Sequence, residues 1–235
     1  MCPSYMATLQ EKDSTRARAN MLRQLLSSPK EETFSNPDLH EILDLCLSCK
    51  GCQTECPSGV DMGKLKAETL QQSYLKNGVP LRTKLIGHFP TLQRYASYVA
   101  PFYNFIVEFP LTASIVKLAM GFSIERSLPI VQFTSLEKWF DRYAKKNPQD
   151  AFEKGYVYLL ADEFTNHNEV PLGQKTVKLL NQLGYGVQIP KGIVTGRSFI
   201  SKGMLIEAKA LANSNVDQLS AIITAEHPLV GIEPS

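Results

Sequence analysis

The chain has 235 residues, of which 43% are hydrophobic and 20% are charged, and its formal net charge at pH 7 is +2. These proportions are those of an ordinary soluble globular protein with room for one large or two small domains. The net charge is too small to indicate nucleic-acid binding, and no run of Lys and Arg or aromatic–basic patch suggests it. We therefore expect no nucleic-acid partner.

The N-terminal third of the sequence predicts helices. Apolar residues at helical spacing predict a helix over residues 4–28 after a short entry, with Asp13, Ser14 and Thr15 as N-cap candidates. Asn36 followed by Pro37 predicts the start of a short second helix, which leads directly to Cys46. Asp61 is the expected N-cap of a third helix that runs to about Lys76.

Four of the five cysteines form one motif with the spacing C-x2-C-x2-C-x3-C-P, at Cys46, Cys49, Cys52 and Cys56. This spacing is typical of bacterial ferredoxins, where the thiolates hold a [4Fe–4S] cluster. The short gaps let successive thiolates turn inward around one cluster, and the proline then directs the chain away. Tetrahedral zinc is the alternative, although zinc ligands usually come as two pairs separated by a longer loop. A disulfide framework fits less well, because five is an odd number.

The fifth cysteine, Cys2, is followed by Pro3, like the last cysteine of such a run. In two-cluster ferredoxins the cysteine before the proline binds the cluster of the other run. By this rule Cys46, Cys49, Cys52 and Cys2 would hold one cluster, and Cys56 would serve a second. In the simpler alternative Cys56 completes the first cluster and Cys2 is free. We favour the crossed arrangement.

Several cations near the motif have two interpretations. Arg16, Arg18 and Arg23 either face an anionic cluster or are ordinary solvated charges of a helix. Lys50 lies between two predicted ligands, and we favour a solvated position for it.

Short helical segments divided by the prolines at 90, 101, 110 and 129 are expected up to about residue 147. The apolar region from Tyr95 to Met120 is interrupted by two prolines and a glutamate, and a membrane span needs about 20 uninterrupted apolar residues. A buried helical pair is favoured there, and contact with a membrane surface is the alternative. With no signal-peptide pattern and with clustered, reduced cysteines, we expect a cytoplasmic protein, with a peripheral position at the inner face of the membrane as the alternative.

Strands and helices alternate in the C-terminal third. Strands are predicted at 156–161, 187–189 and 229–232, with helices at 171–183 and 201–224 between them. Such alternation predicts a small parallel sheet in a partial, Rossmann-like α/β domain. The predicted organisation is therefore α + α/β: an all-helical ferredoxin-like module (1–80), a helical connector (81–150) and the α/β domain (151–235).

Polar residues follow the predicted strands, and ligands of parallel sheets bind beyond the carboxyl ends of the strands. The residues of this predicted pocket are Asp162, Glu163, Asn166, His167 and Arg197. Ordinary helix caps and solvated loops are the alternative. Because the last strand ends the sequence and half a cysteine motif opens it, we also expect the chain to be a fragment of a longer protein.

Several stretches resemble the iron–sulfur part of the FAD-linked oxidases of the D-lactate dehydrogenase, D-2-hydroxyglutarate dehydrogenase and glycolate oxidase type. They are Cys2–Thr8, Asp13–Ala19, Leu45–Met62, Asp162–Asn166, Gly196–Gly203 and Gly231–Ser235. The resemblance implies a helical two-cluster ferredoxin module followed by a domain related to heterodisulfide reductase subunits. It also implies FAD in the intact parent protein, a flavin-binding domain or subunit as partner, and a quinone, cytochrome or other carrier as electron acceptor.

Two departures from the family pattern limit what can be carried over. The three further cysteines of the first cluster are absent before Cys2, which places ligation by Cys56 in doubt. Val194 and Thr195 stand where many members have two cysteines, so no metal cluster is expected at that position. The predicted function is electron transfer in a flavin-dependent 2-hydroxyacid dehydrogenase. The alternatives are a zinc-stabilised interaction module and a heterodisulfide-reductase-like subunit, the second disfavoured because no cysteine follows Cys56.

Overall fold

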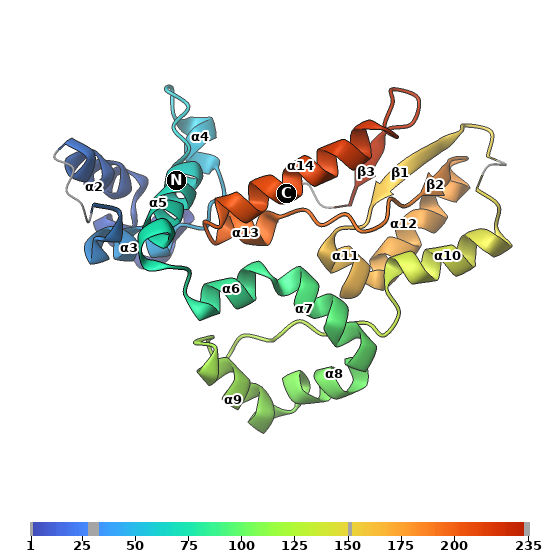
Figure 1. Cartoon of the computed structure of the whole chain (residues 1–235), viewed down its shortest axis with the longest axis horizontal. Coiled ribbons are helices and arrows are strands. Elements are labelled where there is room, and N and C mark those ends of the chain that lie inside the picture. The colour runs from blue at the N-terminus through green and yellow to red at the C-terminus, as the bar shows by residue number, and fades with distance from the viewer. Residues whose placement is uncertain (1, 28–32, 150–151, 233–235) are drawn as a thin grey trace. The chain divides into compact units, whose positions relative to one another are not determined.

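The computed structural model describes residues 2–27, 33–149 and 152–232 (Figure 1). The chain divides into two compact units. Unit 1 comprises Met1–Gly87 and Arg197–Ala208, and unit 2 comprises His88–Gly196 and Lys209–Ser235. The predicted division into three domains at residues 80 and 150 stays a prediction, because compactness alone does not test independent folding.

All regular secondary structure among the described residues of unit 1 is helical. Its elements are α1 (Pro3–Thr8), the 3-10 turn η1 (Glu11–Asp13), α2 (Thr15–Ser27), the 3-10 turn η2 (Thr33–Ser35), α3 (Pro37–Asp44), α4 (Gly51–Glu55), α5 (Met62–Asn77), α6 (Leu81–Gly87), α13 (Arg197–Ser201) and the start of α14 (Leu205–Ser220).

The helix starts predicted from capping residues are confirmed. The Asn36 side chain accepts a hydrogen bond from the Leu39 amide at the start of α3, and Asp61 accepts one from the Lys64 amide at the start of α5. For the helix predicted over residues 4–28, the N-cap candidate Ser14 is confirmed, because its hydroxyl accepts a hydrogen bond from the Ala17 amide (3.1 Å) at the start of α2, but the N-terminal bound at residue 4 is wrong. The chain leaves α1 at Leu9, whose backbone is left-handed (φ 54°), and α2 begins only at Thr15.

The core of unit 1 lies where α2, α3 and α5 meet. Leu22, Leu39, Leu43 and Met62 are buried there, and Cys52 packs against them. The cysteine loop is therefore built directly on the hydrophobic core.

The long helix predicted over 201–224 is also wrong, because the chain breaks at Gly203 between α13 and α14. Gly203 has a left-handed backbone (φ 69°), and a β-carbon there would lie 2.4 Å from Cβ of Leu70 in α5. The Gln71 side chain of α5 accepts a hydrogen bond from the Leu205 amide (2.7 Å) and so caps the start of α14. Packing against α5, which local propensity does not reveal, decides where this helix begins.

Unit 2 combines helices with a small sheet. Its elements are α7 (Phe89–Ala96), the 3-10 turn η3 (Ser97–Val99), α8 (Ala100–Glu108), α9 (Pro110–Ala119), α10 (Leu136–Lys146), β1 (Tyr156–Leu160), α11 (Glu163–His167), α12 (Val170–Gln182), β2 (Gly186–Gln188), the remainder of α14, and β3 (Leu229–Gly231).

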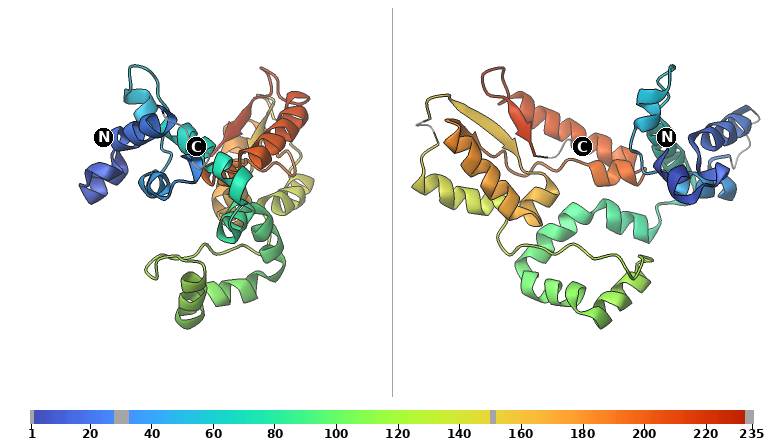
Figure 2. Two further views of the ribbon diagram at one scale, coloured as in Figure 1. Left: turned by 60° about the vertical axis from the view of Figure 1, so that its left-hand side comes forward. Right: turned by 180° about the vertical axis from the view of Figure 1, so that it is seen from behind.

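The sheet is parallel, as predicted, and has the strand order β2-β1-β3. Val157 pairs with Val187, and Leu159 pairs with Val230. Figure 2 shows α12 running beside the strands. Buried residues of α10, α12, β1, β2 and the segments that follow the two strands form one core: Leu136, Phe140, Leu159, Ala161, Val170, Val177, Val187 and Ile189. The fold is thus mostly helical with a three-stranded parallel sheet.

Four prolines begin helices in unit 2, since Pro90, Pro101, Pro110 and Pro171 lie in the first turns of α7, α8, α9 and α12. The buried helical pair favoured for this region is wrong. Helices α8 and α9 contact each other, but Phe102 is 68% exposed and Leu118 is 76% exposed.

Within the described ranges, no single helix has the length and apolar character needed to cross a bilayer. Two consecutive segments, Phe89–Glu108 and Pro110–Ala119, reach the required length and apolar character only when they are taken together. The chain bends by 91° between them.

Candidate metal centre

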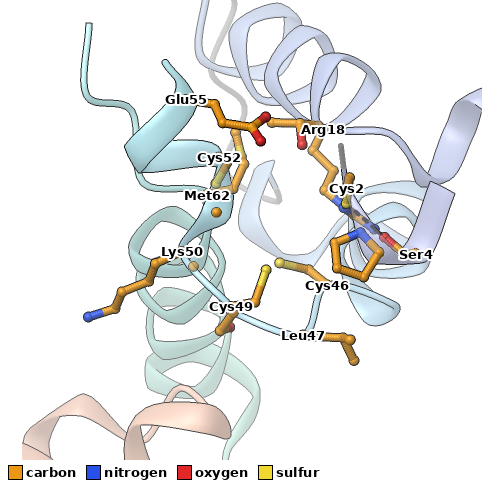
Figure 3. A pocket seen from close by; sticks show the side chains of 15 residues that line it. Cys2, Ser4, Arg18, Cys46, Leu47, Cys49, Lys50, Cys52, Glu55 and Met62 are labelled. Atoms are coloured by element: carbon orange, nitrogen blue, oxygen red, sulfur yellow. Dashed lines mark hydrogen bonds between the residues drawn. The ribbon is translucent and has the colours of Figure 1, made fainter. Parts of the chain in front are cut away.

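Four cysteines line one cavity in unit 1 (Figure 3). Cys46 and Cys49 lie in the loop between α3 and α4, Cys52 lies in the first turn of α4, and Cys2 is the residue before α1. The cavity measures about 70 Å³. In Figure 3 the side chains of Cys46 and Cys49 point toward each other. All four thiols are free of disulfide bonds.

The loop that carries Cys46 and Cys49 has an unusual backbone. Ser48 (φ 55°) and Lys50 (φ 59°) are both left-handed, a conformation that costs free energy for residues other than glycine. These two residues flank Cys49 and curl the chain around the cavity. Gly63 in α5 allows the loop to approach, because a β-carbon there would lie 3.2 Å from Cβ of Ser48.

Arg18 is a buried cation beside the cavity, with only 1% of its surface exposed. Its Nη1 donates to Sγ of Cys2 (3.2 Å), its Nη2 donates to Oγ of Ser4 (2.9 Å), and its Nε donates to the Ile42 carbonyl (2.9 Å). One guanidinium therefore ties the N-terminal cysteine to α3, the helix that leads into Cys46.

The surroundings of Cys2 favour its thiolate. Burial acts to raise the pKa of Cys2, but hydrogen bonds with the Ser4 hydroxyl, the Tyr5 backbone and Arg18 outweigh it and lower the pKa to about 7. A thiolate is the form that binds metals.

Lys66 in α5 holds the backbone of the loop that carries Cys46. No pattern in the sequence indicates this role. Its Nζ donates to the backbone carbonyls of Asp44 (3.0 Å) and Cys46 (2.8 Å). Burial lowers the pKa of Lys66. The lysine is 20 residues from Cys46 along the chain, so only the packing of α5 on the loop reveals the contact.

Cys56 does not line this cavity. It follows α4, and its pKa is lowered by hydrogen bonds from the backbone N–H groups of Val60, Ser58 and Gly59. Its sulfur therefore lies in a separate turn of the chain, where amide groups favour the thiolate.

The other cations near the cysteine motif have exposed side chains. Arg16 is exposed and pairs with Glu11 (2.8 Å), and Arg23 is exposed on α2. Lys50 lines the edge of the cavity but is exposed, and the end of its side chain points outward (Figure 3). Of the three arginines considered from sequence, Arg18 is the one that lines the cavity.

The residues predicted for a pocket in the α/β part are separated by the structure. Asp162 caps α11 by accepting from the amides of Phe164 (2.8 Å) and Thr165 (3.1 Å). Glu163, Asn166 and His167 line a cavity in unit 2. Arg197 groups with unit 1 and does not line that cavity.

The donor set around the unit 1 cavity fits an iron–sulfur cluster. Four thiols line it, one of them has a lowered pKa, and a buried cation faces the resulting negative charge. Cysteine thiolates supported by surrounding hydrogen bonds are the usual ligands of such clusters. Among the described residues, no three His, Cys, Asp or Glu side chains form a group that could hold a single metal ion.

Comparison with known proteins points the same way. Residues 1–61 match the family model of the 4Fe-4S dicluster domain. The D-2-hydroxyglutarate dehydrogenase of Haemophilus influenzae is 21% identical over an alignment that covers 100% of this chain and 27% of the relative. The corresponding enzyme of Escherichia coli is 25% identical over 87% of this chain and 20% of the relative.

The glycolate oxidase iron-sulfur subunit of Escherichia coli is 41% identical over 59 residues, which are 25% of this chain and 14% of that subunit. No solved structure matches the chain significantly. The chain spans only 27% and 22% of the length of two curated D-2-hydroxyglutarate dehydrogenases that it matches. These findings confirm the resemblance seen in the sequence: residues 1–61 are similar to the 4Fe-4S dicluster domain, the chain is similar to part of the D-2-hydroxyglutarate dehydrogenases, and 59 of its residues are similar to a glycolate oxidase iron-sulfur subunit.

Proposed function

We propose that the chain is the electron-transfer part of a flavin-dependent 2-hydroxyacid dehydrogenase or oxidase. In this proposal Cys46, Cys49, Cys52 and Cys2 hold one [4Fe–4S] cluster. The observation that carries the proposal is that these four cysteines line one cavity, whereas Cys56 does not. When bound, such a cluster accepts and releases single electrons.

The neighbouring side chains prepare this cavity for a negatively charged group. The Arg18 guanidinium holds Cys2 in place and supplies a positive charge with little access to water. Lys66 holds the Cys46 backbone and thereby orients the thiol. Because charge interactions strengthen away from bulk water, both side chains favour the ionised thiols over the neutral ones.

Cys56 is proposed as a ligand of a second cluster. Two clusters with four cysteine ligands each need eight cysteines, and this sequence contains five. The remaining ligands would then come from residues outside the sequence. The dicluster family model and the separate position of Cys56 support this assignment.

The proposed partners are a flavin-binding domain or subunit as electron donor and a quinone, cytochrome or other carrier as acceptor. The names of the relatives, which include a D-2-hydroxyglutarate dehydrogenase and a glycolate oxidase subunit, support 2-hydroxyacids as the substrate class of the whole assembly. The exposed apolar side chains of α8 and α9 support contact with a membrane surface, since large apolar patches usually mark interaction sites.

Anaerobic reconstitution with iron and sulfide tests the cluster and its ligands together. We expect about four irons and four sulfides per chain, and one EPR signal after dithionite reduction. Cys2→Ser should lose most of this iron and sulfide, whereas Cys56→Ser should retain it. The opposite result for the two variants would assign Cys56 as the fourth ligand, and a colourless protein with one zinc and no sulfide would refute the cluster itself.

A further inference from the structure

Unit 2 contains a second cavity, at the carboxyl ends of two strands. β1 and β2 are parallel neighbours, so their carboxyl ends lie at the same edge of the sheet. The residues that follow β1 form α11, and those that follow β2 include Lys191 and Gly192. Both segments line a cavity of about 410 Å³, together with residues of α7 and α10. Crevices in this position are the usual ligand sites of parallel sheets.

The cavity is lined by three cations and two carboxylates. The cations are Arg94, Lys138 and Lys191, and the carboxylates are Glu137 and Glu163. Glu137 accepts a hydrogen bond from the Gly192 amide (3.2 Å). Glu163 accepts hydrogen bonds from the Thr195 hydroxyl (2.9 Å) and the Thr195 amide (3.2 Å). Both carboxylates are therefore already engaged by neighbouring groups of unit 2.

The cations are held more loosely than the carboxylates. Lys191 pairs with Asp141 at an exposed position (2.8 Å), and Lys138 lies over the Tyr98 ring (4.6 Å). Exposed interactions of this kind are weak, so these cations can also interact with a ligand.

His167 is one of the buried polar residues that line this cavity. It is 9% exposed, and its Nδ1 atom is buried without a hydrogen-bond partner. Burial lowers the pKa of His167, and the nearby charges of Arg94 and Lys138 lower it further. A buried nitrogen without a partner costs free energy, and like-charged neighbours add to the cost of its protonated form. An anion in the cavity would reduce both costs.

We propose that this cavity binds a small oxyanion, carried by a carboxylate or a phosphate group. His167 donates its Nδ1–H to the anion, and Arg94 and Lys138 neutralise its charge. A neutral imidazole can donate from one nitrogen, so the proposal assigns the proton to Nδ1. The site is independent of the cysteine cavity in unit 1, and it can be tested whether or not a cluster is loaded.

Nuclear magnetic resonance of the histidine rings tests whether the cavity binds an anion beside His167. The chain has four histidines, so selective nitrogen-15 labelling gives few signals, and His167→Gln assigns one of them. The probes are inorganic phosphate and succinate, each added at constant ionic strength so that screening does not change. We expect a saturable shift of the His167 signals. We also expect the pH at which this ring titrates to rise, because a bound anion favours the imidazolium.

Two exposed cations of the cavity and one matched control complete the test. Arg94→Gln and Lys138→Gln should each weaken binding by about tenfold, which corresponds to the loss of one charged hydrogen bond. Lys145→Gln changes a cation of the same helix as Lys138 that does not line the cavity, and it should leave binding unchanged. All three side chains are exposed, so folding should be retained.

Each outcome decides for or against the proposal. Binding of phosphate, of succinate or of both supports it and names the ligand class. No saturable shift with either probe overturns it. If Lys145→Gln weakens anion binding as much as Arg94→Gln and Lys138→Gln do, the proposal is also overturned, because the loss of binding would then reflect the general surface charge.

Discussion

Arg18 connects segments of the site that are distant in sequence. Its guanidinium contacts Cys2 and Ser4 on one side and the Ile42 carbonyl on the other. A planar guanidinium can make these three bonds at once in a fixed geometry, which a lysine cannot. The charge of Arg18 therefore serves both to position Cys2 and to favour its thiolate.

Replacing Arg18 should change the acidity of Cys2 in the metal-free protein. The pKa of Cys2 is about 7. In Arg18→Gln the pKa of Cys2 should rise, because the hydrogen bond from the cation is gone, while the hydrogen bonds with Ser4 and the Tyr5 backbone remain. The measurement is the rate of alkylation of Cys2 against pH, read by mass spectrometry of the digested protein.

Arg16→Gln is the matched control, since Arg16 is exposed and bonds to Glu11 instead. It should leave the pH midpoint unchanged. If folded Arg18→Gln, checked by circular dichroism, also keeps a midpoint near 7, the guanidinium does not set the acidity of Cys2.

Lys66 is expected to stabilise unit 1 through its two bonds to the loop backbone. Lys66→Met keeps much of the apolar stem but removes the donors, so it should lower the free energy of unfolding by about 1–2 kcal/mol. Urea denaturation measures this change. Lys64→Met is the control at an exposed position of the same helix, and a similar loss there would rule out a specific role of Lys66.

At the scale of the elements, close approach decides several details of the fold. Gly186 in β2 lies against the chain at Gln149, where a β-carbon would lie only 2.0 Å from the Gln149 carbonyl oxygen. The Gln149 side chain accepts hydrogen bonds from the Val187 amide (3.0 Å) and from Asn181 (2.9 Å). The segment before β1 is therefore tied to β2 and to α12.

Gly186→Ala should weaken this arrangement, because backbone must move to admit the methyl group. We expect the free energy of unfolding to fall by about 1–3 kcal/mol, as for other overpacked sites. Thermal and urea denaturation measure it. Gln188→Ala, at a partly exposed position of the same strand, should change stability by less than about 0.5 kcal/mol. An unchanged stability of Gly186→Ala would show that the Gln149 segment moves freely.

Elements with local signals could be predicted from the sequence. The caps Asn36 and Asp61 are visible in it because a capping side chain bonds to an amide three residues later. Ser14 marks the start of α2 in the same way, because its hydroxyl accepts a hydrogen bond from the Ala17 amide, whereas the break at Gly203 has no such signal. At Gly203 the cause is contact with Leu70 and Gln71, more than 130 positions earlier in the chain, and no local pattern reports such a contact.

At the scale of the whole molecule, the two compact units carry the two candidate sites. Unit 1 contains the cysteine cavity and the residues that match the dicluster family model. Unit 2 contains the parallel sheet and the cavity beyond its strands. The two D-2-hydroxyglutarate dehydrogenases compared above are several times longer than this chain.

The sequence alone determined the spacing of the candidate thiol ligands, and it predicted the small parallel sheet. The spacing of Cys46, Cys49 and Cys52 is a local property, because two-residue gaps suffice to bring three thiols to one loop. The alternation of strands and helices likewise predicts a parallel sheet. The resemblance to a family rests on the same short motifs.

Only the tertiary structure decided which further residues join these sites. It brings Cys2 and Arg18 to the cavity, places Lys66 against the loop and directs Cys56 elsewhere. It also shows that the residues of the pocket predicted in the α/β part do not all lie together. Asp162 caps helix α11, whereas His167 lines a cavity with Arg94. These outcomes depend on contacts between segments that are far apart in the chain, and such contacts form only when the hydrophobic cores pack.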